Sequence, residues 1–225
     1  MMMNLFSIFD PTSTFMPTLN LNWSSTLLIM MLMPSNFWLI FSRKNMLFYN
    51  MMMKIHLEIK ILMGNMKINS TLMFSSLFLF IMINNFMGLF PYIFTSTSHM
   101  ITSLTLSFPL WMMMMMFGWF KHMNHMFIHL LPQNTPNTLM PFMVMIESIS
   151  NFIRPLTLAV RLTANMIAGH LLMTLLSDMG TKISMISSFF LVMLQILLLI
   201  LEYAVSIIQS YVFMVLITLY SSEVK

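Results

Sequence analysis

Apolar residues along the chain are grouped into five long runs separated by short polar segments. The first three runs have the length of one membrane helix, about 20 residues. The first of them contains Pro34, which a membrane helix tolerates when its neighbours satisfy the freed backbone groups. The last two runs are apolar almost throughout and are much longer. In order, the runs cover residues 23–41, 71–94, 100–120, 139–177 and 185–220.

The two long runs predict an unusual arrangement. As α-helices they would extend roughly 54–58 Å at about 1.5 Å per residue, against a hydrocarbon core of about 30 Å. Fitting either run inside the bilayer requires a tilt of roughly 55°, which is steeper than the ordinary range of about 0–40°. Pro141 and Pro155 are positions where the first helix can bend. We therefore expect a long, steeply tilted two-helix hairpin that turns within the polar loop 178–188.

Composition excludes a soluble protein. Of the 225 residues, 59% are hydrophobic and 7% are charged, whereas a soluble domain carries about 25% charged residues. The chain has no cysteine, which excludes disulfides and thiolate metal sites. Its 33 methionines are spread widely as flexible apolar fillers, which disfavours a copper site and resembles the codon bias of animal mitochondrial gene products. The predicted fold class is an all-α polytopic membrane protein with a single membrane domain, 1–225.

Charge predicts the topology of this membrane domain. Half of all lysine and arginine residues lie in the connection 43–67, which the positive-inside rule places on the matrix or cytoplasmic side. The N-terminus is then outside and the C-terminus inside. Within this connection, residues 51–62 are expected to form an amphipathic helix on the membrane surface. Residues 1–10 lack the charged and apolar regions of a cleavable signal peptide.

Polar residues inside the long hairpin follow one antiparallel register. Arg161 lies in an apolar stretch, although a guanidinium stays charged and a charge at mid-bilayer costs roughly 2.5–3.5 kcal/mol on insertion scales. Three polar pairs would lie side by side if the chain turns near residue 185, because the members of each pair are equally distant from that turn. The pairs are Arg161 with Gln209, Glu147 with Glu223, and His170 with Glu202.

Arg161 is also predicted to stand on a face that another helix can approach. On an α-helix, Arg161, Asn165 and Ala168 share one stripe, with Ala164 nearby, while His170 points to the opposite side. Small residues allow a neighbouring membrane helix to come close.

Several stretches together resemble a known family. The polar span 84–92, the loop 131–136, the segment 147–170 and the segment 209–213 follow each other in order. With Arg161 and His170 they resemble the subunit a family of F-type ATP synthases, in its mitochondrially encoded form, over nearly the whole chain. One departure is Asn134, where the family tends to have glycine, and it bears on the conformation of that loop.

The resemblance implies a stator that faces a rotating ring of small c-type subunits, each with one buried carboxylate. Two offset half-channels would reach the ring from opposite sides of the mitochondrial inner membrane. Arg161 would attract the deprotonated carboxylate and separate the half-channels, so that a proton crosses only on the ring. The residues implied for the half-channel open to the intermembrane space are His170, Glu202, Asn165 and Gln209. Those implied for the matrix half-channel are Glu147 and Glu223.

The side-chain chemistry agrees with these roles. Arginine is a fixed cation and suits a barrier, whereas histidine and glutamate titrate and suit a relay. The expected partners are the ring, other stator subunits, the lipid bilayer and protons, without nucleic acid. No cofactor or metal is expected. With only five glycines the chain has no phosphate-binding loop, so it would be a non-catalytic subunit of a proton-transporting ATPase.

Structural interpretations compete with these roles. Arg161 could form an ion pair between packed helices, His170 and Glu202 a simple interhelical hydrogen bond, and Glu223 a solvated terminus. Amide side chains join membrane helices without conducting anything, and Arg154 can snorkel to the inner interface. The amides concerned are Asn84, Asn85, Asn165 and Gln209. A zinc site is the less favoured interpretation of three histidines on one helical face, His122, His125 and His129, because no acid or cysteine completes it.

Other functions are less compatible with the sequence. A proton-translocating subunit of a respiratory-chain complex would carry lysines within its spans, but Lys182 lies in the predicted turn. A haem-binding subunit needs histidines paired across two spans, and only His170 lies deep. A purely structural subunit would not need the set of Arg161, His170, Glu202 and Gln209.

Overall fold

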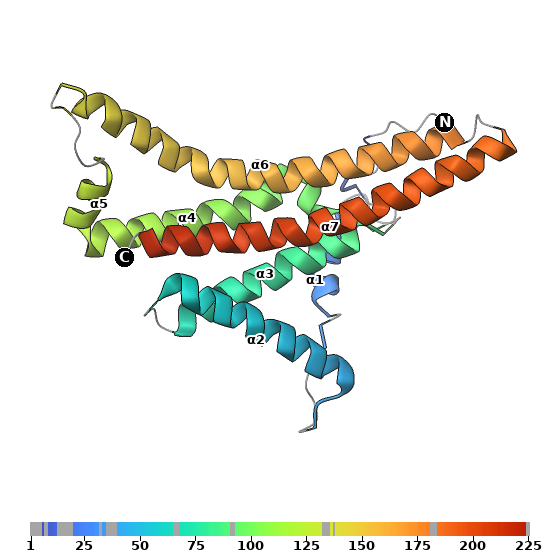
Figure 1. Cartoon of the computed structure of the whole chain (residues 1–225), viewed down its shortest axis with the longest axis horizontal. Helices are drawn as coiled ribbons and strands as arrows, with labels where there is room; N and C mark the ends of the chain where they lie inside the picture. The colour runs from blue at the N-terminus through green and yellow to red at the C-terminus, as the bar shows by residue number, and fades with distance from the viewer. Residues whose placement is uncertain are drawn as a thin grey trace.

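The computed structural model describes residues 6, 9–12, 20–31, 33–34, 40–64, 68–90, 93–131, 136, 138–180 and 184–223. This part of the chain is helical and contains no strand (Figure 1). The all-α class is therefore confirmed. The elements are η2 (Leu21–Ser24), α1 (Ser25–Met30), α2 (Arg43–Met63), α3 (Ile68–Gly88), η3 (Ser96–Ser98), α4 (Met100–Lys121), α5 (Met123–His129), α6 (Met140–Gly180) and α7 (Met185–Glu223).

The predicted long hairpin is the largest feature of the molecule. Helices α6 and α7 have 41 and 39 residues; they lie side by side toward the end that holds their turn and diverge toward the start of α6, where α6 packs on α4 instead (Figure 1). They end and begin inside the predicted turn. Figure 1 shows α6 bowed in its middle part, and Pro155 lies inside this helix. At about 1.5 Å per residue each helix is roughly 60 Å long, so both need a steep tilt to remain within a bilayer.

The register of the hairpin can be judged at Gly169. A Cβ atom added to Gly169 would lie 3.0 Å from Oε1 of Glu202, so the two residues face each other across the hairpin. Gly169 and Glu202 are nearly equidistant from residue 185, as the predicted register requires. A residue without a side chain thus leaves room for a carboxylate between the helices.

Four described helices are long and apolar enough to cross a membrane, namely α3, α4, α6 and α7. The first apolar run differs from the expectation. Helix α1 has six residues and ends at Met30, which is too short to cross a bilayer. Residues 32 and 35–39 lie outside the described part of the chain, so a crossing by the run 23–41 stays a prediction.

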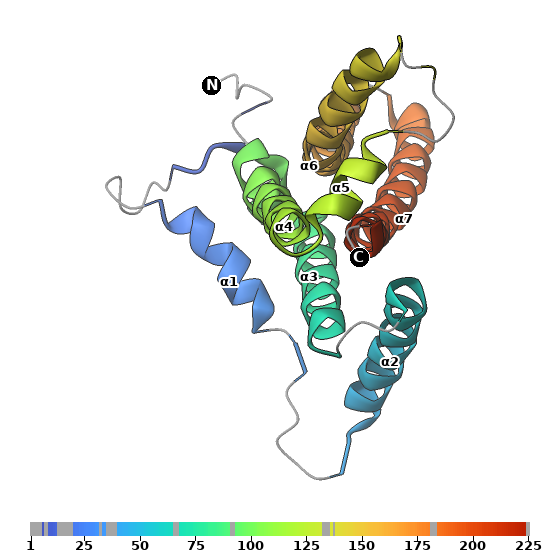
Figure 2. The ribbon, with the colours of Figure 1, turned by 90° about the vertical axis from the view of Figure 1, so that its left-hand side faces the viewer.

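The helices α3 and α4 do not form a closely packed pair. Both have bounds near the predicted ones, but α3 ends at Gly88 and packs mainly on α7, whereas α4 packs mainly on α6. Figure 2 shows α3 between α4 and α7 in a view along the bundle. Each of the two shorter spans therefore packs mainly on a different arm of the long hairpin. The buried apolar core joins them and includes Phe74, Phe78, Leu110, Leu158, Phe213 and Met214.

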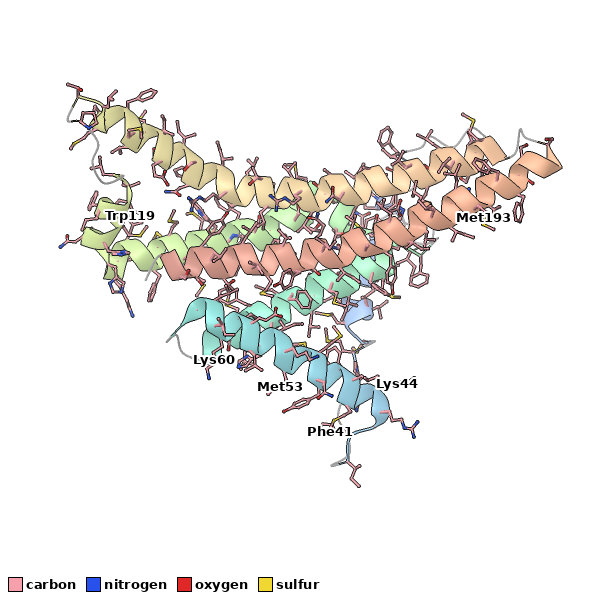
Figure 3. The ribbon with its side chains drawn as sticks, viewed as in Figure 1. Phe41, Lys44, Met53, Lys60, Trp119 and Met193 are labelled. Atoms are coloured by element: carbon pink, nitrogen blue, oxygen red, sulfur yellow. The ribbon has the colours of Figure 1, made fainter. Side chains whose placement is uncertain are left out.

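The basic connection forms one long helix, α2, that covers the predicted amphipathic segment 51–62. Ser42 accepts a hydrogen bond from the Asn45 backbone N–H at the start of α2, and Gly64 with φ of 61° ends it, a conformation that glycine adopts at little cost. One face of α2 packs against α3 and α7, and Ile59 of α2 is fully buried. Figure 3 shows Lys44 and Lys60 toward opposite ends of α2, and both are exposed.

Candidate functional site

Arg161 lies near the middle of α6, on the face turned away from the other helices. Its side chain is exposed, as are Ala164 and Ala168 on the same stripe. The opposite face of the helix holds Leu162 and Met166, which are 3% and 6% exposed. No carboxylate among the described side chains forms an ion pair with Arg161. A carboxylate that neutralises this charge must therefore come from outside the described part of the chain.

A cavity of about 270 Å³ lies between α3, α6 and α7; we call it the His170 cavity. Its polar lining consists of Asn165, His170, Glu202, Ser206, Gln209 and Asn85. The structure thus brings together the four residues that the resemblance assigns to one half-channel. It adds Ser206 and Asn85, the second of which the sequence favoured as a helix-joining amide. The role of all six in proton transfer stays a proposal.

His170 and Glu202 carry unpaired polar atoms in this cavity. The His170 ring is hydrogen-bonded to the backbone of Gly88 and lies edge-on to Phe9, with ring centroids 6.2 Å apart. Nε2 of His170 and Oε1 of Glu202 are buried without a hydrogen-bond partner among the described residues. These two atoms therefore do not form a direct bond with each other. Ordered water is the usual partner of such atoms, and it can carry a proton between an acid and a base.

Gly169 offers a test of the Glu202 position. In Gly169→Ala, the new methyl group would meet Cδ and Oε1 of Glu202 at 3.0 Å, so the carboxylate must shift from its place in the cavity. We expect a loss of proton-driven ATP synthesis per assembled complex, with a destabilisation of about 1–3 kcal/mol from overpacking. Gly180→Ala is the control, because its methyl group would meet its nearest neighbour, Leu191, at 3.9 Å. Equal activity of the two variants would contradict this placement of Glu202.

A larger pocket of about 520 Å³ lies between α4, α5, α6 and the end of α7; we call it the Glu147 pocket. Oε1 of Glu147 is 3.6 Å from Nη2 of Arg154, and the guanidinium carbon of Arg154 lies 5.2 Å from the centroid of the Tyr220 ring. Tryptophan and methionine side chains form much of the remaining wall, including Trp119, which Figure 3 labels at this end of the molecule.

The Glu147–Arg154 pair places opposite charges in an accessible pocket. The two side chains are 35% and 32% exposed, and an ion pair with such exposure contributes at most about 1 kcal/mol to stability. Its main effect is to hold a titratable carboxylate at the pocket wall. The sequence placed Arg154 at the interface by snorkelling and missed its contact with Tyr220, which comes from the far end of α7.

Some predicted residues cannot be placed. The Glu223 side chain lies outside the described part of the structure, so its pairing with Glu147 stays a prediction. The same holds for the loop around Asn134 and for the His129 side chain. The described side chains contain no group of three histidines or acids close enough to hold a metal ion.

The fold and the two cavities define a class of protein. One exposed arginine lies on a membrane helix between two pockets that hold titratable groups, and four helices of the described chain are long enough to cross a bilayer. These are features of polytopic membrane subunits in which ionisable residues within the spans mark a path for ions or protons.

Comparison with known proteins identifies the family. Residues 22–222 match the family described as ATP synthase A chain, and the chain belongs to it. Similar proteins named ATP synthase subunit a are found in Drosophila melanogaster, with 59% identity, Aedes aegypti, with 60%, and Locusta migratoria, with 58%. Each alignment covers 100% of this chain and 100% of the relative. The alternative of a respiratory-chain subunit is not favoured.

Proposed function

We propose that Arg161 separates two proton half-channels, one ending in the His170 cavity and one in the Glu147 pocket. The chain is the proton-translocating stator subunit of an F-type ATP synthase, a multi-pass membrane protein that assembles with the other subunits of the membrane sector. The proposal assigns the residues of this chain to steps of proton transfer. It also names a ring of small c-type subunits as the partner of the Arg161 face.

The observation that carries the proposal is the position of Arg161. It lies on an outward face lined by the small residues Ala164 and Ala168, where a neighbouring helix can approach closely. Along α6, Arg161 is about 14 Å from His170 and about 21 Å from Glu147 at 1.5 Å per residue. A fixed cation therefore stands between two titratable sites.

The proposed path begins at the His170 cavity. A proton enters between His170 and Glu202 and passes along Asn165 and Gln209 to a deprotonated ring carboxylate. Once neutral, that carboxylate can leave Arg161 and enter the lipid, because an uncharged group crosses hydrocarbon at a far lower cost than an ion. After the ring has turned, the carboxylate reaches the other side of Arg161 and releases its proton toward the Glu147 pocket. Glu223 is proposed as a second acid on that side.

Arg161 has two effects in this cycle. It stabilises the deprotonated ring carboxylate at the interface, and it prevents a proton from passing directly between the half-channels, because a guanidinium does not release its proton. One charge moved through 100 mV is worth about 2.3 kcal/mol. A direct path would dissipate that energy without turning the ring.

We also propose a sidedness for the two half-channels. The basic helix α2 lies on the matrix side by the positive-inside rule, and α3 leads away from it toward Gly88. The His170 cavity then opens to the intermembrane space and the Glu147 pocket to the matrix. The membrane is the mitochondrial inner membrane, with the N-terminus toward the intermembrane space and the C-terminus toward the matrix.

Disulfide cross-linking in the assembled complex tests the ring contact. The chain has no cysteine of its own, so Ala164→Cys introduces its only thiol. We expect it to cross-link with a cysteine placed one helical turn from the ring carboxylate. Thr163→Cys is the matched control, because Thr163 is 6% exposed and faces the interior. Cross-linking from position 163 but not from position 164 would refute the proposed ring-facing surface.

A further inference from the structure

Helix α2 has a single acidic side chain, and that side chain reaches another helix. Glu58 stands among the four lysine and arginine residues of α2. Among the described side chains, its carboxylate forms no ion pair with any of them. It instead accepts a hydrogen bond from the phenol group of Tyr211 on α7. The side chain of Glu58 therefore joins α2 to the long hairpin.

A buried interface joins α2 to the last part of α7. Ile59 and Met63 of α2 are 0% and 2% exposed, and they share one apolar cluster with Met214 of α7. The Oγ atom of Ser221 donates a hydrogen bond to Sδ of Met63 at 2.6 Å. The end of α7 is thus packed against α2 mainly by apolar side chains.

Tyr211 lies where this interface ends along α7. Residues seven positions apart lie on nearly the same side of an α-helix. On the side of Tyr211, Thr218 is fully buried, whereas Ala204 and Leu197, which lie toward the hairpin turn, are exposed. Tyr211 itself is 43% exposed. Its hydrogen bond to Glu58 is therefore a contact at the edge of the α2–α7 interface, beyond which this side of α7 is uncovered within the described chain.

The cavity residues of α7 lie on the other side of the helix. Tyr211 follows Gln209 by two residues, which corresponds to about 200° around the helix axis. Glu202 lies seven residues before Gln209 and shares its side, and both line the His170 cavity. A rotation of α7 about its axis would therefore break the Tyr211 contact and turn both cavity side chains away from their present positions.

We propose that Glu58 is a positioning residue for proton transfer, which acts through the Tyr211 hydroxyl group to fix the rotation of α7 that directs Gln209 and Glu202 into the His170 cavity. Apolar packing is non-directional and fixes rotation only weakly. A hydrogen bond is lost when its angle falls far from linear, so it opposes rotation. The inference rests on the proposed function, because the rotation of α7 affects ATP synthesis only if the cavity conducts protons.

Four variants of the assembled ATP synthase test this role. Glu58→Ala and Tyr211→Phe each remove one partner of the hydrogen bond, and a third variant combines them. Glu58→Gln removes the charge but keeps an oxygen that can accept the bond. The maximal rate of proton-driven ATP synthesis and the KM for ADP are measured in inner-membrane vesicles and normalised to assembled complex. Tyr211→Phe removes one oxygen atom from a partly exposed side chain, so it remains informative if Glu58→Ala fails to assemble.

We expect Glu58→Ala and Tyr211→Phe each to lower the maximal rate by about threefold to tenfold, the effect of losing one hydrogen bond. The combined variant should be no slower than either single variant, because both changes break the same contact. Glu58→Gln should restore a rate close to that of the unchanged protein. The KM for ADP should stay the same in all four variants, because only proton delivery is slowed.

Two matched controls should keep the normal rate. Lys54→Ala removes an exposed charge one helical turn before Glu58, and Tyr203→Phe removes the same hydroxyl group from the tyrosine of α7 that packs on Phe86. A normal rate in Tyr211→Phe, additive losses in the combined variant, or equal losses in Glu58→Gln and Glu58→Ala would each overturn the inference. Fewer assembled complexes with a normal rate per complex would also overturn it, because the contact would then be only structural. The proposed function fails separately, if Arg161→Ala keeps coupled synthesis.

Discussion

Replacing Arg161 with alanine is expected to abolish proton-driven ATP synthesis while the complex still assembles. Arg161 is exposed on its helix, so its removal leaves no cavity in the core of this chain. Removing one partner of a buried ion pair costs about 3–5 kcal/mol, which corresponds to roughly 100-fold or more in rate. The passive proton leak through the membrane sector should rise, because the barrier between the half-channels is lost.

The measurement is ATP synthesis and passive proton leak in the same vesicle preparation, normalised to assembled complex. Arg43→Ala is the control, since it removes an exposed arginine of α2 that lines neither cavity and leaves the proposed barrier. Arg161→Lys keeps a positive charge without the planar guanidinium group and should lie between Arg161→Ala and the unchanged protein. Normal coupled synthesis in Arg161→Ala would contradict the assigned role.

Replacing Glu202 with glutamine should have the second largest effect. The amide has nearly the same shape as the carboxylate, but it does not titrate, so it cannot pass a proton on. General acid–base groups contribute about 10²–10⁴-fold to proton transfer, and we expect a loss of proton-driven ATP synthesis near the lower end, because the cavity can hold water. Glu202→Asp should restore part of the rate, since it retains a titratable group.

The matched control for Glu202 is the neighbouring residue of α7. Tyr203 packs edge-on against Phe86 with ring centroids 4.2 Å apart and does not line the His170 cavity. Tyr203→Phe should therefore leave the rate of ATP synthesis nearly unchanged. A similar loss in Glu202→Gln and Tyr203→Phe would show that packing of α7, and not titration at position 202, limits the rate.

The parts of the fold that depend on length and charge were predictable from sequence. The long hairpin follows from two apolar runs that exceed the bilayer thickness, and the helix ends at Gly180 and Met185 lie inside the predicted turn. The face of Arg161 followed in part from helical periodicity: Ala164 and Ala168 share its exposure, whereas Asn165, which the same stripe included, is half-buried and lines the His170 cavity. In each case the prediction needs only the residues of a single helix or the length of that helix.

Contacts between distant elements were not predictable in the same way. An amide that joins two helices and an amide that lines a cavity look the same in the sequence of an apolar span. Asn85 is placed in the His170 cavity by the packing of α3 on α7. The contact of Arg154 with Tyr220 joins the first part of α6 to the end of α7. The Phe9 ring contacts the His170 ring. These residues lie far apart in the sequence, so no periodic pattern of residues could have predicted their contact.

Access from the two sides of the membrane tests the central claim most directly. Ser206 lines the His170 cavity and Ser148 lines the Glu147 pocket, and each can be replaced by the only cysteine of the chain. Both variants would be treated in the assembled complex with an impermeant thiol reagent from one side at a time. The account predicts that Ser206→Cys reacts only from the intermembrane-space side and Ser148→Cys only from the matrix side. Reaction of both cysteines from the same side would contradict the existence of two opposed half-channels separated by Arg161.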